Sequence, residues 1–246
     1  MSGRRCNPPT NLGSSYSAWR RGSRTPGCSV RPTARWDKPA ASRASWCRRG
    51  QSTQQLAAAS LAISTDQGFP YLHAVGTIGH GRGLVEQGQI EAGMAQMYWG
   101  LGASQAAGIK ILRPYLLALL AEACGQAGHV GTGLNYLAEA IPAAELHGER
   151  FYEAELYRLR GELSSRQAAG NESTAEHCFH QALDIARRQQ ARMWELRTAM
   201  RLARLWQGQG KGVEGRQLLA AVYDRFTEGF ETADLLEARA LLEGLA

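Results

Sequence analysis

The chain has 246 residues, of which 44% are hydrophobic and 20% charged, and its formal net charge at pH 7 is +6. No run of 18 apolar residues occurs, which excludes a membrane-spanning helix. The five cysteines follow neither a disulfide framework nor a zinc-site spacing, which favours a reduced, cytoplasmic protein.

The positive charge belongs to the N-terminal segment. Residues 1–50 hold 11 of the 28 Lys and Arg residues but only one of the 22 acidic residues, so this segment carries about +10 and the rest of the chain about −4. A nucleic-acid partner is therefore expected only for residues 1–50.

Residues 1–52 are rich in Arg, Pro and Ser and nearly devoid of aliphatic side chains. Such a segment cannot bury enough apolar surface to offset the loss of chain entropy, so we expect it to be disordered. Trp19, Trp36 and Trp46 are interleaved with arginines, which leaves two interpretations. One is binding of single-stranded nucleic acid through stacking and phosphate neutralisation. The other is a non-native N-terminus produced by a misplaced start or a shifted reading frame.

From about residue 53 onward the chain is predicted to be helical. Pairs of helices are expected at about 70–107, 113–146, 150–190 and 192–226, with a closing helix at 233–245. Pro70 suits the first turn of a helix, and Ser173 with Glu176 forms an S-x-x-E capping box. Because no stretch alternates between apolar and polar residues, no sheet is expected, and the predicted fold class is all-α.

Four glycines recur at spacings of 40, 42 and 40 residues and are expected to separate the two helices of each pair: Gly88, Gly128, Gly170 and Gly210. A small residue accompanies each glycine on either side. On the first helices these residues are Gly81, Ala121, Gly161 and Ala203, and on the second helices they are Gly93, Gly133, Ala175 and Gly215. Small residues let two helices cross closely, and self-similarity at this period is typical of stacked repeats. Since each unit leaves an apolar face that only a neighbour can cover, residues 53–246 are predicted to form one stacked array.

The spacing of small and large apolar positions resembles the tetratricopeptide repeat, with a unit nearer 40 residues than the usual 34. A narrower resemblance is carried by AEHCFHQALDIARRQQARMWELRTAMRLARLWQGQGK and the following LLAAVYDRFTEGFETADLLEARALLEGL. These segments are similar to the C-terminal repeat region of bacterial signalling proteins that combine a class III adenylate/guanylate cyclase domain with an ATPase domain. The resemblance covers about residues 54–246. It implies a right-handed superhelical α-solenoid that binds proteins, and it implies a fragment, because the sequence holds no cyclase or ATPase domain.

Three candidate motifs for chemistry fail on spacing or context. Gly210-Lys211 lacks the Ser or Thr that follows the lysine of a P-loop. The glycine-rich segment 79–83 follows no predicted strand and falls inside a predicted helix. His177 and His180 can share a helix face, but a zinc site needs three or four converging ligands and no second cluster is visible. We therefore expect no enzyme activity, no cofactor and no metal.

In proteins that this chain resembles, the first helices of successive repeats line a concave groove. Transferred unit by unit, the lining positions are Ile78, Arg82, Tyr115, Glu122, Arg158, Glu162, Arg166, Arg197, Met200 and Arg204. The arginines of the later units suit bidentate capture of carboxylates on an acidic peptide or domain. The alternative is that these arginines form i, i+4 pairs with neighbouring glutamates and only make the face soluble.

The sequence therefore predicts a non-catalytic interaction scaffold from a cyclase/ATPase-type signalling protein, with a protein or peptide partner and no membrane partner. Two alternatives stay open. One is a nucleic-acid-associated protein that acts through residues 1–50, with the repeats as a dimerisation or regulatory body. The other is the effector-sensing end of an ATPase-type transcriptional regulator.

Overall fold

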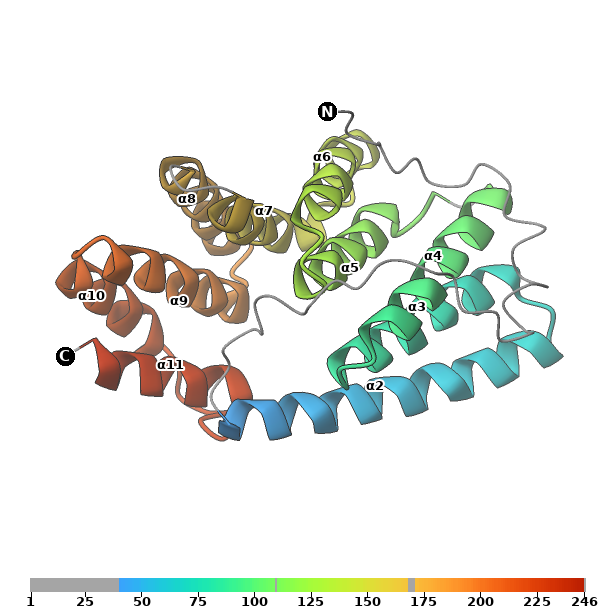
Figure 1. Ribbon diagram of the computed structural model, residues 1–246, viewed down its shortest axis with the longest axis horizontal. Coiled ribbons are helices and arrows are strands. Elements are labelled where there is room, and N and C mark those ends of the chain that lie inside the picture. Colours follow the sequence, from blue (N-terminus) through green and yellow to red (C-terminus); the bar gives the residue numbers. More distant parts are fainter. Residues whose placement is uncertain (1–39, 109, 168–170, 246) are drawn as a thin grey trace, which may run out of the picture. The chain divides into compact units, whose positions relative to one another are not determined.

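The computed structural model describes residues 40–108, 110–167 and 171–245, and every regular element in these ranges is a helix (Figure 1). The prediction of an all-α fold is thereby confirmed for the described part of the chain. The disorder expected for residues 1–39, the interpretation of Trp19 and Trp36, and the turn expected at Gly170 lie outside the described residues. Within the ranges above, no helix is both long and apolar enough to cross a membrane.

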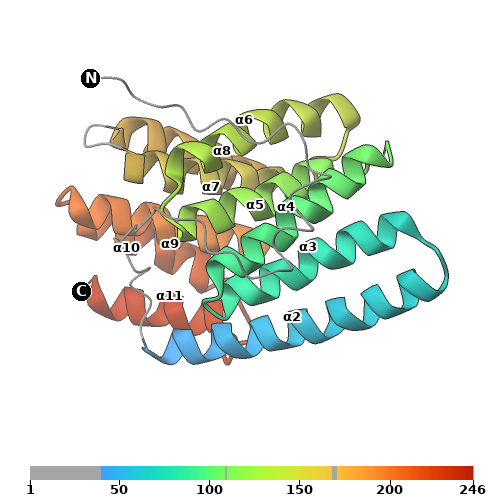
Figure 2. The ribbon, with the colours of Figure 1, turned by 45° about the vertical axis from the view of Figure 1, so that its right-hand side comes forward.

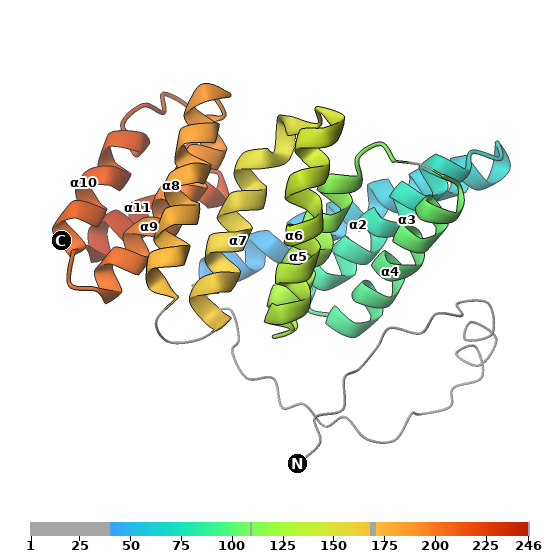
Figure 3. The ribbon, with the colours of Figure 1, turned by 90° about the horizontal axis from the view of Figure 1, so that it is seen from above.

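The helices follow one another as antiparallel pairs that pack side by side in chain order (Figure 3). The first pair consists of α3 (Pro70–Glu86) and α4 (Ile90–Ala106), and the second of α5 (Arg113–Gln126) and α6 (Val130–His147). The third consists of α7 (Glu153–Gln167), which follows the short 3-10 helix η1 (Arg150–Tyr152), and α8 (Glu172–Arg188). The fourth consists of α9 (Arg192–Gly208) and α10 (Gly212–Tyr223), and α11 (Ala233–Gly244) follows it.

Within each pair, the two helices cross at the small residues that the repeat pattern predicts. A Cβ added to Gly81 would lie 2.5 Å from the carbonyl oxygen of Gly93, so only glycine fits there. In the other pairs the added Cβ would lie 3.0–3.1 Å from the carbonyl oxygen of the partner residue: Gly133 from Ala121, Gly161 from Ala175 and Gly215 from Ala203. The predicted crossing positions are therefore confirmed, including Gly161, which lies nine residues before Gly170 whereas the other first-helix positions lie seven before their glycine.

One helix begins inside the segment for which disorder is predicted. Helix α2 (Ala40–Asp66) precedes the first pair and packs on α3 (Figure 2). A Cβ added to Gly76 of α3 would lie 3.1 Å from Cγ of Leu61, and Ala57 of α2 is buried. Composition misses only residues 40–52 of this helix, because alanine is the best helix former yet adds little apolar surface. The later part of α2 is predicted to be helical, and its small face is buried through its close approach to α3.

The glycine-rich segment 79–83 belongs to α3 and not to a phosphate-binding loop. Helix α3 lies between α2 and α4, and glycines of α3 face each neighbour: Gly76 faces α2, and Gly81 faces α4. Each glycine weakens a helix by about 1 kcal/mol relative to alanine. These glycines offset that cost by allowing α3 to pack closely against α2 and α4.

The turns recur at half the predicted period. The recurring turns each contain a residue in the left-handed conformation, and these residues are mostly 20 apart in the sequence: Gly68, Gly88, Gly108, Gly128, Gly148, Gln190 and Gly210. The next N–H returns to the carbonyl five residues earlier both in turns within pairs and in turns before or between pairs, namely at Gly68, Gly88, Gly128, Gln190 and Gly210. His129 N donates to Cys124 O at 2.8 Å, and Ala191 N donates to Ala186 O at 2.9 Å. Gly68, Gly108 and Gly148 carry this signal in the sequence, but the 40-residue pattern does not include them.

Gln190 holds this left-handed conformation, with φ = 54°, where the other turns use glycine. Replacing Gln190 with Gly should raise the free energy of unfolding by about 0.5 kcal/mol, because relief of left-handed strain exceeds the added entropy of the unfolded chain. Gln190 is exposed, so no packing is lost. Urea denaturation of Gln190→Gly measures the effect.

Gly210→Gln is the matched control, because an added Cβ at Gly210 meets nothing within 4 Å and only the φ of 78° is strained. This variant should lose stability. A Gln190→Gly variant no more stable than the parent chain would show that residue 190 bears no strain.

Candidate functional site

The charged residues of the first helices form an ion-pair network whose contacts join α3 to α5, α7 to α9, and α9 to α11. At its α3 end, Arg82 lies 2.9 Å from Glu86 on the same helix and 3.5 Å from Glu122 on α5. At its α11 end, Arg197 pairs with Asp234 at 2.7 Å and Arg204 with Glu237 at 2.8 Å. Between α5 and α7 the link is a longer-range attraction of Glu122 for Arg158, so the network involves residues from four successive repeats and the helix after them.

Arg158 of α7 is the buried centre of this network. Its Nη1 donates to Glu162 at 2.7 Å, and its Nε and Nη2 donate to Glu155 at 2.9–3.1 Å. Burial alone would lower the pKa of Arg158, but the facing carboxylates of Glu155 and Glu162 hold it above its ordinary value. The guanidinium is therefore a permanent positive charge on which two buried carboxylates depend.

Glu162 accepts ion pairs from three helix positions on α7 and α9. Arg158 and Arg166 of its own helix lie 2.7 and 3.0 Å from its carboxylate oxygens, and Arg201 of α9 lies 3.5 Å away. Burial favours the neutral acid, but Arg201, Arg158 and Arg166 together lower the pKa of Glu162 below its ordinary 4.5. Glu162 consequently stays ionised at neutral pH and ties the third repeat to the fourth.

Aromatic rings lie beside this network at the start of the first helices. Tyr115 and Tyr152 meet edge to face with ring centroids 4.9 Å apart, and Tyr152 meets Trp194 in the same way at 5.6 Å. Burial, and then the carboxylates of Glu155 and Glu122, raise the pKa of Tyr152 above its ordinary value. These ring contacts pack consecutive repeats together, and Tyr115 is one member of this row of rings.

Four of the expected groove residues are buried: the apolar Ile78 and Met200, and the charged Arg158 and Glu162. Ile78 is 0% exposed and Met200 is 4% exposed, so neither can line an open groove. Both occupy the repeat position that Ala118 and Arg158 occupy in the second and third units, and all four side chains are buried. This position faces the adjacent helices, which is why its one charged member, Arg158, needs two carboxylates.

Tyr115 lies in the row of rings, and the expected charged residues lie in the network, where their pairing follows the alternative interpretation in part. Arg82, Arg158 and Arg166 each pair with a glutamate four residues away on the same helix. Arg197 and Arg204 instead pair with α11, and Glu122 pairs with α3. Interhelical pairs of this kind cannot be inferred from spacing within one helix.

Arg201 belongs to the same face and is missing from the expected set. With Arg197 and Arg204 it forms an i, i+4, i+7 series on α9, which we call the arginine stripe. These side chains are 30, 24 and 33% exposed, whereas their partners Asp234, Glu162 and Glu237 are only 10, 5 and 8% exposed. The carboxylates therefore form the floor and the guanidinium groups form the surface. The RTAMRLAR spacing alone could have revealed the stripe.

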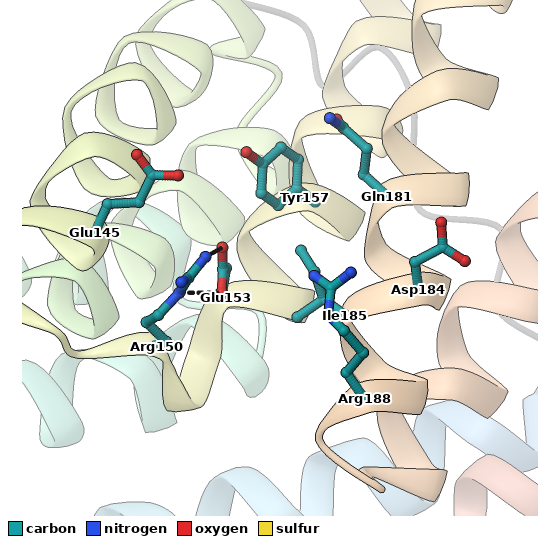
Figure 4. A pocket seen from close by; sticks show the side chains of 8 residues that line it. All are labelled: Glu145, Arg150, Glu153, Tyr157, Gln181, Asp184, Ile185 and Arg188. Carbon is teal, nitrogen blue, oxygen red and sulfur yellow. Dashed lines mark hydrogen bonds and ion pairs between the residues drawn. The ribbon is translucent and has the colours of Figure 1, made fainter.

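A separate pocket of about 250 Å³ lies between the end of α6, the start of α7 and α8. Figure 4 shows Arg150 and Glu153 on its α7 side, where Arg150 donates to Glu153 at 2.9 and 3.0 Å, and Asp184 and Arg188 on its α8 side. The lining is completed by Glu145, Tyr157, Gln181 and Ile185. Acidic and basic groups alternate around this pocket, and none of the expected site residues lines it.

His177 and His180 gain no further metal ligands from neighbouring helices. Among the side chains that the structure describes, no group of three or more His, Cys, Asp or Glu residues could hold a metal ion.

Replacing Arg158 with Met should lower the free energy of unfolding by about 3 kcal/mol at pH 7, because it leaves buried carboxylates without their main cation. The parent chain should lose stability as pH falls below about 4.5, since the folded-state pKa of Glu162 lies below that value. In the variant the carboxylates take up protons more readily, so the deficit relative to the parent should shrink between pH 7 and pH 4.5. Urea denaturation at both pH values measures it.

Arg160→Met on the exposed side of the same helix is the control and should change stability by less than about 0.5 kcal/mol at either pH. A deficit of Arg158→Met that is the same at pH 7 and pH 4.5 would contradict the electrostatic role.

Comparison with known proteins supports the fold and leaves the family open. No protein-family model and no curated protein matches the chain. Among solved structures, it is similar to nearly identical TPR-like repeats of a chain assigned as a kinesin light chain from Podosopora anserina. The similarity has a TM-score of 0.53 and 16% sequence identity, and it covers 76% of this chain and 96% of that one. At this identity the likeness establishes the fold alone, and the chain has a TPR-like helical-repeat fold.

Proposed function

We propose that this chain is a non-catalytic interaction scaffold that binds a protein partner on the face formed by its first helices. The observation that carries the proposal is the ion-pair network on that face, in which partly exposed arginines from Arg82 to Arg204 lie over largely buried carboxylates. Apolar residues would serve a purely structural role at least as well, because replacing buried ion pairs by hydrophobic residues is often neutral or stabilising. A polar face built from every repeat is better explained by recognition of another molecule.

The sequence resemblance supports a narrower proposal about context. We infer that the scaffold is the C-terminal repeat region of a cyclase/ATPase-type signalling protein and acts in the cytoplasm. The DNA upstream of the Met1 codon tests this. An ATPase coding region there, in frame or frame-shifted, supports the proposal, and an unrelated gene contradicts it.

The charge of residues 1–50 supports nucleic-acid binding as a second candidate function, with about +10 in that segment against about −4 in the remainder. A truncation that removes residues 1–39 leaves α2 intact and tests this candidate. The truncation removes eight of the eleven basic residues in residues 1–50, so salt-sensitive binding of DNA or RNA that weakens sharply supports the candidate, and binding of unchanged affinity contradicts it. An effector-sensing role in a transcriptional regulator would use the same first-helix face.

A photo-reactive amino acid placed at Arg204 of α9 should cross-link the partner in cells, because this side chain is one-third exposed on the first-helix face. The same amino acid at Arg216, exposed on the second helix α10, is the matched control and should capture little. Mass spectrometry of the cross-linked species measures both. Equal capture at the two positions would contradict binding through the first helices.

A further inference from the structure

We propose that the arginine stripe of α9 binds an acidic, extended segment of the partner protein that carries a carboxylate at every third residue. The proposal rests on the scaffold function above and adds the chemistry of the partner. It uses Arg197, Arg201 and Arg204 as the contact surface.

The geometry of α9 sets the spacing of the acidic groups. Residues seven apart on a helix lie about 10.5 Å apart along its axis, so Arg197 and Arg204 present two guanidinium groups at about that separation. In a polyproline-type extended segment, residues three apart lie on one side and about 9 Å apart. Flexible side chains close the difference, so acidic residues at i and i+3 match the two ends of the stripe.

The buried carboxylates hold the stripe ready for a ligand. Asp234 accepts from Nε and Nη2 of Arg197 at 3.1 and 2.7 Å, and Glu237 accepts from Nη2 of Arg204 at 2.8 Å. A guanidinium has five N–H donors, so these bonds fix its plane and leave further donors available. Guanidinium groups fixed in this way lose little conformational entropy when a carboxylate binds.

The surroundings favour a short acidic segment over nucleic acid. Beneath the stripe lie Glu162, Asp234 and Glu237, and residues 51–246 carry about −4. A polyphosphate chain would be repelled over most of its length by such a surface, because nucleic-acid affinity depends on many cationic contacts. Single carboxylates that each reach one guanidinium avoid this repulsion.

Fluorescence anisotropy with a labelled 16-residue peptide that carries Glu at every third position tests the proposal on the full chain. Arg201→Gln combined with Arg204→Gln should weaken binding about tenfold, because it removes charge-assisted hydrogen bonds while keeping polar side chains of similar reach. The control combines Arg216→Gln with Arg239→Gln, which removes the same charge at exposed positions off the stripe and should change binding less than about twofold.

Two further probes sharpen the result. A peptide of the same composition with its glutamates contiguous should bind more weakly, and a single-stranded DNA 16-mer should not compete. Equal loss in both double variants, equal binding of the two peptides, or effective competition by DNA would each overturn the proposal. Circular dichroism checks that the variants fold, and Arg201→Lys with Arg204→Lys, which keeps the charge but loses the planar fork, should give an intermediate loss.

The outcome separates this proposal from the scaffold function. If the partner cross-links at residue 204 but the glutamate peptide does not bind, the acidic-segment proposal is wrong and the scaffold function stands. If neither is observed, both are wrong.

Discussion

Close approach of the two helices in each pair is the contact on which the other features depend. At Gly81 and Gly93 each residue takes the space that a Cβ of the other would need, and the later pairs repeat this crossing with one glycine and one alanine. A crossing fixed by backbone contact leaves little freedom to slide or rotate. The first helices of successive repeats therefore meet at a constant register, and Arg82 can reach Glu122 one repeat later.

The same register places charged side chains in buried positions, where each charge must be compensated by an opposite one. Arg158 occupies a repeat position that Ile78 and Met200 fill with apolar side chains. Its charged side chain is therefore buried about as deeply as those apolar side chains. Glu155 and Glu162 compensate it, and Glu162 in turn joins α7 to α9 through Arg201. Burial of charge at this level adds little net stability, but it orients every member of the network. The partly exposed arginines of α9 are oriented by the carboxylates with which they pair.

Much of the fold can be predicted from local sequence patterns, whereas the pairing of charged residues on the surface cannot. The helix pairs and their crossing residues could be predicted because small residues and turn glycines recur along the chain itself. The start of α2 could not, since residues 40–52 share the Arg- and Ser-rich composition of the segment before them. The sequence analysis places Ile78 and Met200 in the groove because it carries repeat positions over from proteins that the chain resembles. Those positions do not say which side of each helix faces the neighbouring unit. Pairing of Arg197 and Arg204 with α11 depends on how the chain returns after the last pair, which spacing within a helix cannot reveal.

The floor of the arginine stripe has a consequence for the motions of the chain. Asp234 and Glu237 belong to α11, which packs on α9 and α10 beyond the last pair. Helix α11 also touches α2, but its contacts with α9, α10 and α2 are far fewer than those between the two helices of a pair, so it opens more readily than they do. Each opening of α11 withdraws two negative charges from Arg197 and Arg204 and lets their guanidinium groups turn freely. The electrostatic attraction of this surface for an anion is thus coupled to the fraying of one short helix.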